Sequence, residues 1–267
     1  MPTTHDRLHR ALLDAASEPS QPLWLVLIGH GTFDGRLAKL NLVGTDVSTE
    51  DLQAWCAPLQ RPLAVIGSYS ASGALIEQLS APRRVIVTST KNAAEVNFSR
   101  FGGLLATSLA DASADLDKDQ QVSLLEAFVK ASRKTREFYE ADGRIETEHA
   151  LLDDNGDAKG TRADAFRGLT PVATPEDAAI RLDGPFAHQW HAVPSTRERQ
   201  LGPEIAAQRD SLELRIAELK QRRAQLTEED YYHELEALLV PLAELLTDDP
   251  ATSGPAASNP GSELKEE

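Results

Sequence analysis

The chain has 267 residues, of which 41% are hydrophobic, enough for one sizeable core with appended segments. It carries 27 Lys and Arg against 42 Asp and Glu. The resulting net charge of −15 argues against nucleic acid or an anionic membrane as a partner and favours cations. The single cysteine, Cys56, excludes an internal disulfide, and no apolar run approaches the ~18 residues of a membrane span. We expect no export signal within this stretch.

Three short apolar runs predict buried strands. They cover residues 23–28, 63–66 and 84–88, and their mostly β-branched or apolar side chains are typical of strands that are buried on both faces. Amphipathic segments precede and separate the runs. Residues 6–16 predict one helix, and Ser48 predicts the N-cap of another. This alternation predicts an α/β fold with a mostly parallel sheet flanked by helices.

The same patterns divide the chain into four segments. Residues 1–140 should form the α/β domain, which closes with a helix over residues 123–140. Residues 141–202 are rich in Asp, Gly and Pro and predict an irregular acidic segment. Residues 203–247 predict a helical hairpin, and residues 248–267 have the Pro-, Ser-, Ala- and Gly-rich composition of a disordered tail.

Each helix of the predicted hairpin carries an apolar stripe at coiled-coil-like spacing. Residues 227–230 form a capping signal for the second helix, and Pro241 predicts a kink in it. Such a stripe either packs on its own domain or forms a dimer interface. The sequence leaves both alternatives open, so a homodimer through the C-terminal helices is one expected partnership.

Two of the apolar runs end in polar turns that contain glycine. The first turn includes His30 and Gly31, and the second includes Ser70. Catalytic groups in open α/β sheets collect beyond the carboxyl ends of the strands, so this imidazole and this hydroxyl are two parts of an acyl-transfer site. In such a site Ser70 attacks a carbonyl carbon and His30 moves the proton. The N–H groups of Gly31 and Ser70 hold the oxyanion.

The turns and the segments after them resemble the caspase clan of cysteine peptidases, in particular the legumain-type family. The segment that resembles the family's histidine region contains His30-Gly31, Asp34-Gly35, Asn41-Leu42 and the helix start at residues 46–52. Ser70-Ala71-Ser72-Gly73 is similar to the family's Cys-x-Ser-Gly nucleophile turn, and residues 87–95 are similar to its next strand and loop. The resemblance covers residues 22–110. It implies a caspase-like fold, hydrolysis of peptide bonds and a peptide or protein substrate.

One departure from the family concerns the nucleophile, because Ser70 stands where the family has its cysteine. A thiol is nucleophilic with little help, whereas a hydroxyl needs a base and a third group that orients the base. The sequence assigns no Asp or Glu to orient His30. Two functions stay open: a peptidase-like enzyme with a Ser70–His30 dyad, and an inactive pseudopeptidase that acts as an interaction or assembly module. Ser68 and Ser72 are the other candidate hydroxyls.

An acidic segment has the ligand spacing of an EF-hand-like calcium loop. Oxygen atoms fall at positions 1, 3, 5, 7, 9 and 12, the seventh from a main-chain carbonyl. The residues are Asp115, Asp117, Asp119, Gln121, Ser123 and Glu126. Gln120 occupies position 6, where glycine normally makes the sharp turn. The alternative is an acidic helix N-terminus whose carboxylates only complement the helix dipole.

A second, weaker copy of this spacing begins at Asp153. It continues through Asn155 and Asp157 and ends at Asp164. Two such loops could form a paired calcium unit, and the alternative is coincidence in an Asp- and Gly-rich stretch. Further on, residues 188–191 place two histidines three residues apart. No third ligand accompanies them, so we expect a structural aromatic patch there rather than a transition-metal site.

Overall fold

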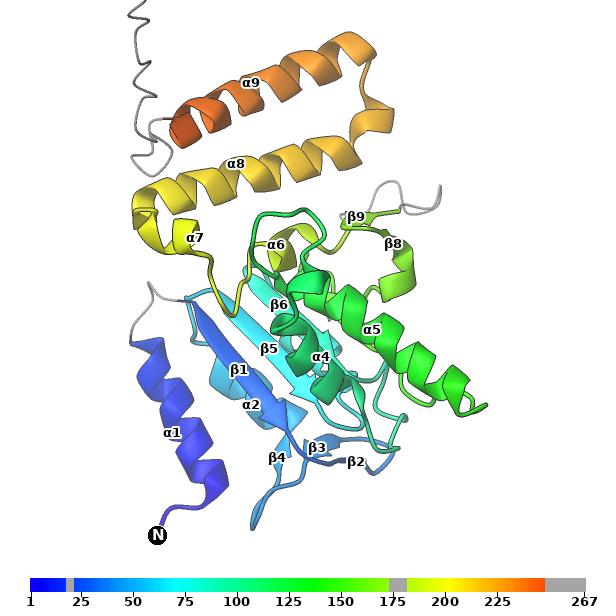
Figure 1. The fold of residues 1–267 in the computed structure, drawn as a ribbon. Coiled ribbons are helices and arrows are strands. Elements are labelled where there is room, and N and C mark those ends of the chain that lie inside the picture. The colour runs from blue at the N-terminus through cyan, green and yellow to red at the C-terminus, as the bar shows by residue number, and fades with distance from the viewer. Residues whose placement is uncertain (18–21, 173–181, 248–267) are drawn as a thin grey trace, which may run out of the picture. The chain divides into compact units, whose positions relative to one another are not determined.

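The computed structural model describes residues 1–17, 22–172 and 182–247, and Figure 1 traces the chain. The chain divides into two compact units, residues 1–193 and residues 194–267, and each is described by itself. None of the described helices combines the length and the apolar composition that a membrane span requires.

A four-stranded sheet lies at the centre of the first unit, in the order β1–β5–β6–β7 (Figure 1). Its parallel strands are β1 (Leu23–Ile28), β5 (Leu63–Ser68) and β6 (Arg84–Thr88), and β7 (Leu151–Asp153) pairs antiparallel with β6. The α/β class and the mostly parallel sheet predicted from the sequence are therefore confirmed. The sequence does not predict β7, because three residues are too few to show a strand pattern.

Helices cover both faces of the sheet. Side chains alternate between the two faces along a strand, so neighbouring residues of one strand point into different cores. Val65 and Ile86 point into one core, and Ile66 and Val87 point into the core on the opposite face. The helices that pack on the first core are α1 (Thr4–Ala16), α2 (Thr49–Cys56) and α3 (Ala74–Leu79). Those that pack on the second are α4 (Phe101–Leu109) and α5 (Leu124–Ala141).

Short elements complete the first unit. A three-stranded antiparallel sheet follows β1 and consists of β2 (Gly31–Phe33), β3 (Ala38–Leu40) and β4 (Val47–Ser48). The other short elements are the 3-10 helices η1 (Ala112–Ala114) and η2 (Ala163–Ala165), the strands β8 (Phe166–Arg167) and β9 (Thr170–Pro171), and the helix α6 (Pro185–His188). The structure thus differs from the predicted boundary at residue 140. The chain up to Val193 belongs to this unit, because β7 extends the sheet and Ala187 of α6 lies in its core.

β1 forms an open edge of the sheet. The described residues add no strand outside it. Val26 is 50% exposed and Ile28 is 77% exposed, although both are large apolar residues. Beside them lies a hollow of about 330 Å³ whose lining includes Trp24, Ile66 and Leu105. The edge strand therefore presents an apolar surface without a cover.

The second unit is helical where it is described. Its helices are α7 (Thr196–Gln200), α8 (Pro203–Gln221) and α9 (Glu228–Thr247), with the 3-10 helix η3 (Arg223–Gln225) between α8 and α9. Ile216 and Leu219 of α8 share a small core with Tyr231 and Leu238 of α9. Pro241 lies inside α9. The predicted disordered tail falls outside the described residues.

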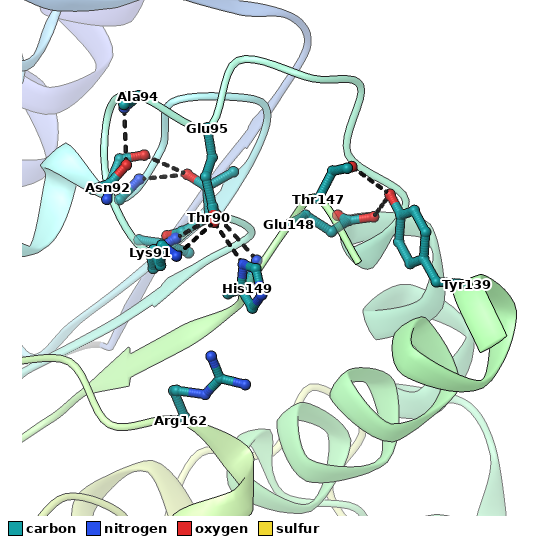
Figure 2. A network of polar contacts seen from close by, with 12 residues as sticks. Thr90, Lys91, Asn92, Ala94, Glu95, Tyr139, Thr147, Glu148, His149 and Arg162 are labelled. Carbon is teal, nitrogen blue, oxygen red and sulfur yellow. Dashed lines mark hydrogen bonds and ion pairs between the residues drawn. The ribbon is translucent and has the colours of Figure 1, made fainter. Parts of the chain in front are cut away.

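Glu148 fastens the start of α4 to the rest of the first unit. Its carboxylate is almost completely buried and accepts hydrogen bonds from Ser99 Oγ (2.6 Å), the main-chain N–H of Arg100 (2.9 Å) and that of Phe101 (3.1 Å). The hydroxyl of Tyr139 donates a fourth (Figure 2). Because the residue at the N-cap of α4 provides no capping side chain, Glu148 satisfies N–H groups that the helix itself leaves free.

Replacing Glu148 should therefore destabilise the unit strongly. We expect Glu148→Ala to lower the free energy of unfolding by about 3 kcal/mol, because several buried donors lose their acceptor at once. Glu140→Ala is the matched control, since Glu140 is exposed on α5, and it should change the free energy by less than about 0.5 kcal/mol. Urea unfolding followed by circular dichroism measures both values, and equal effects of the two substitutions would contradict the assigned role of Glu148.

Candidate functional site

The ends of β1 and β5 bring His30 and Ser70 together. Ile28 and Ser68 are partners in the parallel register, so the turns that follow them begin side by side. Ser70 Oγ lies 3.3 Å from His30 Nδ1. The Ser70 side chain is buried, whereas His30 is exposed. A hydroxyl and an imidazole thus lie within hydrogen-bond reach at the carboxyl edge of the sheet.

The main chain of Gly31 bonds to the same hydroxyl twice. Its N–H donates to Ser70 Oγ over 3.1 Å, and Ser70 Oγ donates to its carbonyl oxygen over 2.9 Å. A hydroxyl has one proton, so Ser70 can donate either to this carbonyl or to the imidazole of His30. Nucleophilic attack requires the second arrangement. It also requires the Gly31 N–H to leave Oγ if that N–H is to hold an oxyanion.

Close contact between the two turns explains why glycine occupies position 31. A Cβ atom there would lie 1.9 Å from the carbonyl oxygen of Ser70, a distance that no real structure can accommodate. Gly73, at the other end of the second turn, is equally confined, because a Cβ would lie 2.3 Å from the main-chain nitrogen of Asn92. Gly31 therefore lets the main chains of the two turns approach closely enough for Ser70 to reach His30, and Gly73 lets the second turn approach the loop after β6.

The other two candidate hydroxyls, those of Ser72 and Ser68, do not bond to a histidine among the described residues. Ser72 is buried, and its Oγ accepts a hydrogen bond from the main-chain N–H of Ser89 over 3.1 Å. It also lies 3.3 Å from Thr90 Oγ1, which accepts the N–H of Gly73. Ser68 ends β5. Neither makes a hydrogen bond to a histidine within the described part of the chain.

No carboxylate among the described residues orients the His30 imidazole. Its described side-chain hydrogen bond is the one with Ser70. A candidate nucleophile and a candidate base are therefore present, and the described residues include no carboxylate that would complete a triad. The only thiol cannot substitute for the hydroxyl. Cys56 lies buried in α2, and burial raises the pKa of its thiol to about 11, so the group stays protonated and unreactive.

The first acidic loop turns tightly around the Asp115 carboxylate. Carboxylate oxygens of Asp115, Asp117 and Asp119 lie within 4.8 Å of one another. The Asp115 carboxylate accepts the N–H groups of Lys118 (2.6 Å) and Gln120 (3.2 Å). Gln120 has a φ of 70°, so it adopts the left-handed conformation that glycine usually supplies at position 6. The missing glycine thus does not prevent the turn.

The far end of this loop is the start of α5. Ser123 is the N-cap, and Glu126 Oε2 accepts its N–H over 2.8 Å. Glu126 Oε1 accepts the N–H of Leu116 over 2.6 Å. These contacts are those of the helix-capping alternative. The same carboxylate also groups with Asp117 and His188 to within 4.8 Å, so capping and ligation draw on the same oxygens.

His188, which the sequence places in a predicted aromatic patch, lies beside the first acidic loop. Its Nε2 lies 3.0 Å from Asp117 Oδ2. Burial is the main reason that the pKa of Asp117 is raised, with a further contribution from Asp119. His191, the other histidine of the predicted aromatic patch, pairs with Ser123 through the main chain. The distance along the chain between His188 and the loop hides this proximity from sequence reasoning.

The second acidic loop repeats the conformation of the first. The fourth and sixth positions are Gly156 and Ala158. The N–H of Ala158 donates to Ser80 Oγ over 3.0 Å, whereas the N–H at the sixth position of the first loop donates to Asp115. Gly156 and Ala158 have left-handed φ values, 81° and 61°, as Lys118 and Gln120 do at the same positions of the first loop. Asn155 Oδ1 accepts the N–H of Asp157 over 2.8 Å, as Asp117 accepts that of the residue two further on.

Two features of the second loop do not favour a full ligand set. Both oxygens of Asp153 accept a hydrogen bond from Ser80 Oγ at 3.0 Å. Asp164, at the twelfth position, forms ion pairs with Arg162 (3.4 Å) and Arg136 (3.8 Å) instead. The main chain of this loop therefore matches the predicted copy better than its side chains do.

A pair of buried carboxyl groups that the sequence does not reveal holds the second loop in place. Asp183 accepts the N–H of Asp154 (2.9 Å) and the hydroxyl of Thr161 (2.6 Å). Asp154 accepts the N–H groups of Gly184 (2.9 Å) and Ala187 (2.6 Å) at the start of α6. Burial raises the pKa of both carboxyl groups, and the neighbouring Asp154 carboxylate raises the pKa of Asp183 further.

A carboxylate–histidine pair also lies at the carboxyl edge of the sheet. Glu95, in the loop after β6, has Oε1 2.6 Å from Nδ1 of His149, which precedes β7 (Figure 2). Glu95 belongs to a segment that the resemblance includes, but His149 was not singled out. No spacing rule links residues 54 positions apart, so only the antiparallel pairing of β7 with β6 brings the two together.

Comparisons with protein-family models, with curated proteins and with solved structures found no match to this chain. The imidazole of His30 and the main-chain N–H of Gly31 both lie within 3.3 Å of the Ser70 hydroxyl oxygen. These are the groups that acyl transfer uses as nucleophile, base and oxyanion donor.

The buried pair of Asp154 and Asp183 predicts a pH-dependent stability. An acid whose native pKa is raised binds its proton more tightly in the folded state, so the free energy of unfolding falls as pH rises from about 4, the unfolded pKa, towards the native value. For Asp183 that native value is about 8. The chain should therefore be less stable at pH 8 than at pH 5 through this pair.

Asp183→Asn should remove most of that loss, on the order of 2 kcal/mol, because an amide keeps the shape of the carboxyl group but does not ionise. Urea unfolding at pH 5 and pH 8 measures the difference for each protein. Asp142→Asn, at the exposed end of α5, is the control and should keep the pH dependence of the unsubstituted chain. If the free energy of unfolding of Asp183→Asn fell between pH 5 and pH 8 by as much as that of the unsubstituted chain, Asp183 would not be the source of the pH dependence.

Proposed function

We propose that this chain is a caspase-fold, peptidase-like protein in which Ser70 and His30 hydrolyse a peptide bond. The observation that carries the proposal is the 3.3 Å contact between Ser70 Oγ and His30 Nδ1. The Gly31 N–H at the same oxygen supports it, because that donor is already beside the reacting atom. The resemblance to the legumain-type family supplies the substrate class, a peptide or protein.

The proposed reaction needs the Ser70 proton to change its acceptor and the Gly31 N–H to leave Ser70 Oγ. Ser70 turns its proton from the Gly31 carbonyl to His30 and attacks the carbonyl carbon of the substrate. The Gly31 N–H and the N–H of Ser70 stabilise the oxyanion that forms. His30 then gives the proton to the departing amine, which leaves an ester on Ser70. A water molecule, deprotonated by His30, hydrolyses the ester and restores the hydroxyl.

A specific observation favours the second candidate function, a pseudopeptidase that serves as an assembly module. The hydroxyl proton of Ser70 has a good acceptor in the Gly31 carbonyl at 2.9 Å, closer than the imidazole. Within the described chain, no carboxylate fixes His30 as a base. Under this alternative Ser70 is a structural link between two turns, and the exposed Tyr232, Leu239 and Val240 of α9 offer an apolar surface for a homodimer.

Substitution of Ser70 separates the two functions. We expect Ser70→Ala to abolish hydrolysis of a fluorogenic peptide library, by at least about 100-fold, because the nucleophile is gone. Ser70→Cys should retain or increase turnover, because a thiol needs less activation than a hydroxyl. Ser68→Ala is the matched control and should leave turnover unchanged. If none of the proteins turns over any peptide, the pseudopeptidase alternative replaces the enzyme.

We also propose that the acidic loops bind calcium, as the spacing predicts. The supporting observation is that the residues at positions 4 and 6 have a left-handed main chain in both loops, and that in the first loop the carboxylate at position 1 accepts their N–H groups. In the first loop Asp115, Asp117, Asp119 and Glu126 provide hard oxygen ligands that fit this cation. Bound calcium would neutralise their mutual repulsion and brace the start of α5.

Calorimetric titration with calcium chloride tests this proposal. We expect heat of binding from the unsubstituted chain and at least about tenfold weaker binding in Asp119→Asn and Glu126→Gln, which each remove one anionic ligand. Asp142→Asn, outside both loops, should bind as the unsubstituted chain does. A chain that gives no heat with calcium, or that binds only zinc and loses it in His188→Ala, would rule out the calcium site.

A further inference from the structure

The residue after Ser70 has a strained main chain. Ala71 has a φ of 63°, in the left-handed region that residues with a Cβ seldom adopt. Its side chain is completely buried. The conformation matters because it sets the direction in which the turn leaves Ser70, and hence where the Ser70 hydroxyl points. Something in the surrounding structure must hold this turn against its own strain.

Residues after β6 bond to the turn at Ser72 and Gly73, and one further main-chain hydrogen bond holds Ala71 itself. The N–H of Ala71 donates to the main-chain oxygen of Glu95 over 2.8 Å. That acceptor is useful only if the main chain at Glu95 is fixed. Val96 and Phe98, which follow it, are exposed large apolar residues, so packing does not hold the segment after Glu95. The Glu95 side chain instead holds this residue to Lys91 and to His149.

The Glu95 carboxylate is fastened on both sides (Figure 2). Oε2 accepts the main-chain N–H of Lys91 over 3.0 Å and that of His149 over 3.1 Å. Oε1 lies 2.6 Å from His149 Nδ1 and 3.5 Å from Lys91 Nζ. The Glu95 side chain is only 12% exposed. Its carboxylate accepts from four donor groups, two on Lys91 of its own loop and two on His149 before β7.

We propose that Glu95 is a positioning residue for Ser70. Its carboxylate fixes the loop after β6 on His149, the fixed loop presents its main-chain oxygen to Ala71, and this bond keeps the left-handed turn that directs the Ser70 hydroxyl to His30. The catalytic consequence rests on the proposed function of the site, whereas the hold on the turn does not. Glu95 touches neither Ser70 Oγ nor His30 among the described contacts, so it acts through Ala71.

Two measurements on one set of proteins test the proposal: amide hydrogen exchange at Ala71, and turnover of the fluorogenic peptide library. Glu95→Ala should speed exchange at Ala71 at least about tenfold and lower kcat about tenfold with a smaller change in KM, because the strained turn loses its support. Glu140→Ala, an exposed glutamate on α5, is the matched control and should change neither quantity.

A rescue experiment separates positioning from general stability. Glycine adopts the left-handed conformation without strain, so Ala71→Gly combined with Glu95→Ala should restore turnover to within about threefold of the unsubstituted chain. Glu95→Gln keeps an acceptor for the two main-chain N–H groups and should lie between the unsubstituted chain and Glu95→Ala. A structural effect unrelated to the turn would not respond to a change at residue 71.

The outcomes are distinguishable. Unchanged exchange at Ala71 in Glu95→Ala would overturn the proposal, and so would faster exchange throughout β5 and β6 that Ala71→Gly does not reverse, since Glu95 would then support the whole unit. Faster exchange confined to the turn, in a chain that turns over no peptide, would keep the hold of Glu95 on the turn and reject the proposed enzyme.

Discussion

The hydrogen bonds between the Ser70 hydroxyl and the main chain of Gly31 are the contact on which the site depends. They join two turns that are far apart in the sequence, and they are possible only because glycine lets one main chain touch the other. Parallel pairing of β1 with β5 sets the turns at the same edge, and the loop after β6 holds the second turn from the other side. His30 and the surrounding loops lie around this contact between Ser70 and Gly31.

The fold was largely readable because β5 and β6 are buried on both faces. The prediction that β1 is also buried on both faces was wrong, because Val26 and Ile28 of this edge strand are exposed. Runs such as residues 63–66 and 84–88 show a nearly continuous apolar pattern, and the helix starts carry explicit capping residues such as Ser48 and Ser123. Strand β7 was not readable, since its three residues extend the sheet through pairing with β6 and not through a pattern of their own. Such pairings are set by tertiary contacts that a single sequence does not encode locally.

The candidate site was readable to the same extent. Motif order and spacing indicated His30 and Ser70, and the ligand spacing indicated the turn at Asp115. What escaped were partners from distant segments: His149 beside Glu95, and His188 beside the first acidic loop. The direction of a hydroxyl proton escaped as well, because it depends on a main-chain carbonyl whose position only the folded chain defines.

The open edge of β1 lies close to the candidate site. The strand whose Val26 and Ile28 face outward without a cover is the strand that ends two residues before His30. A chain that added a strand to this edge would stiffen the segment that carries the imidazole. Any partner at β1 would therefore act as an effector of the site as well as a neighbour, because it would share a strand with the base.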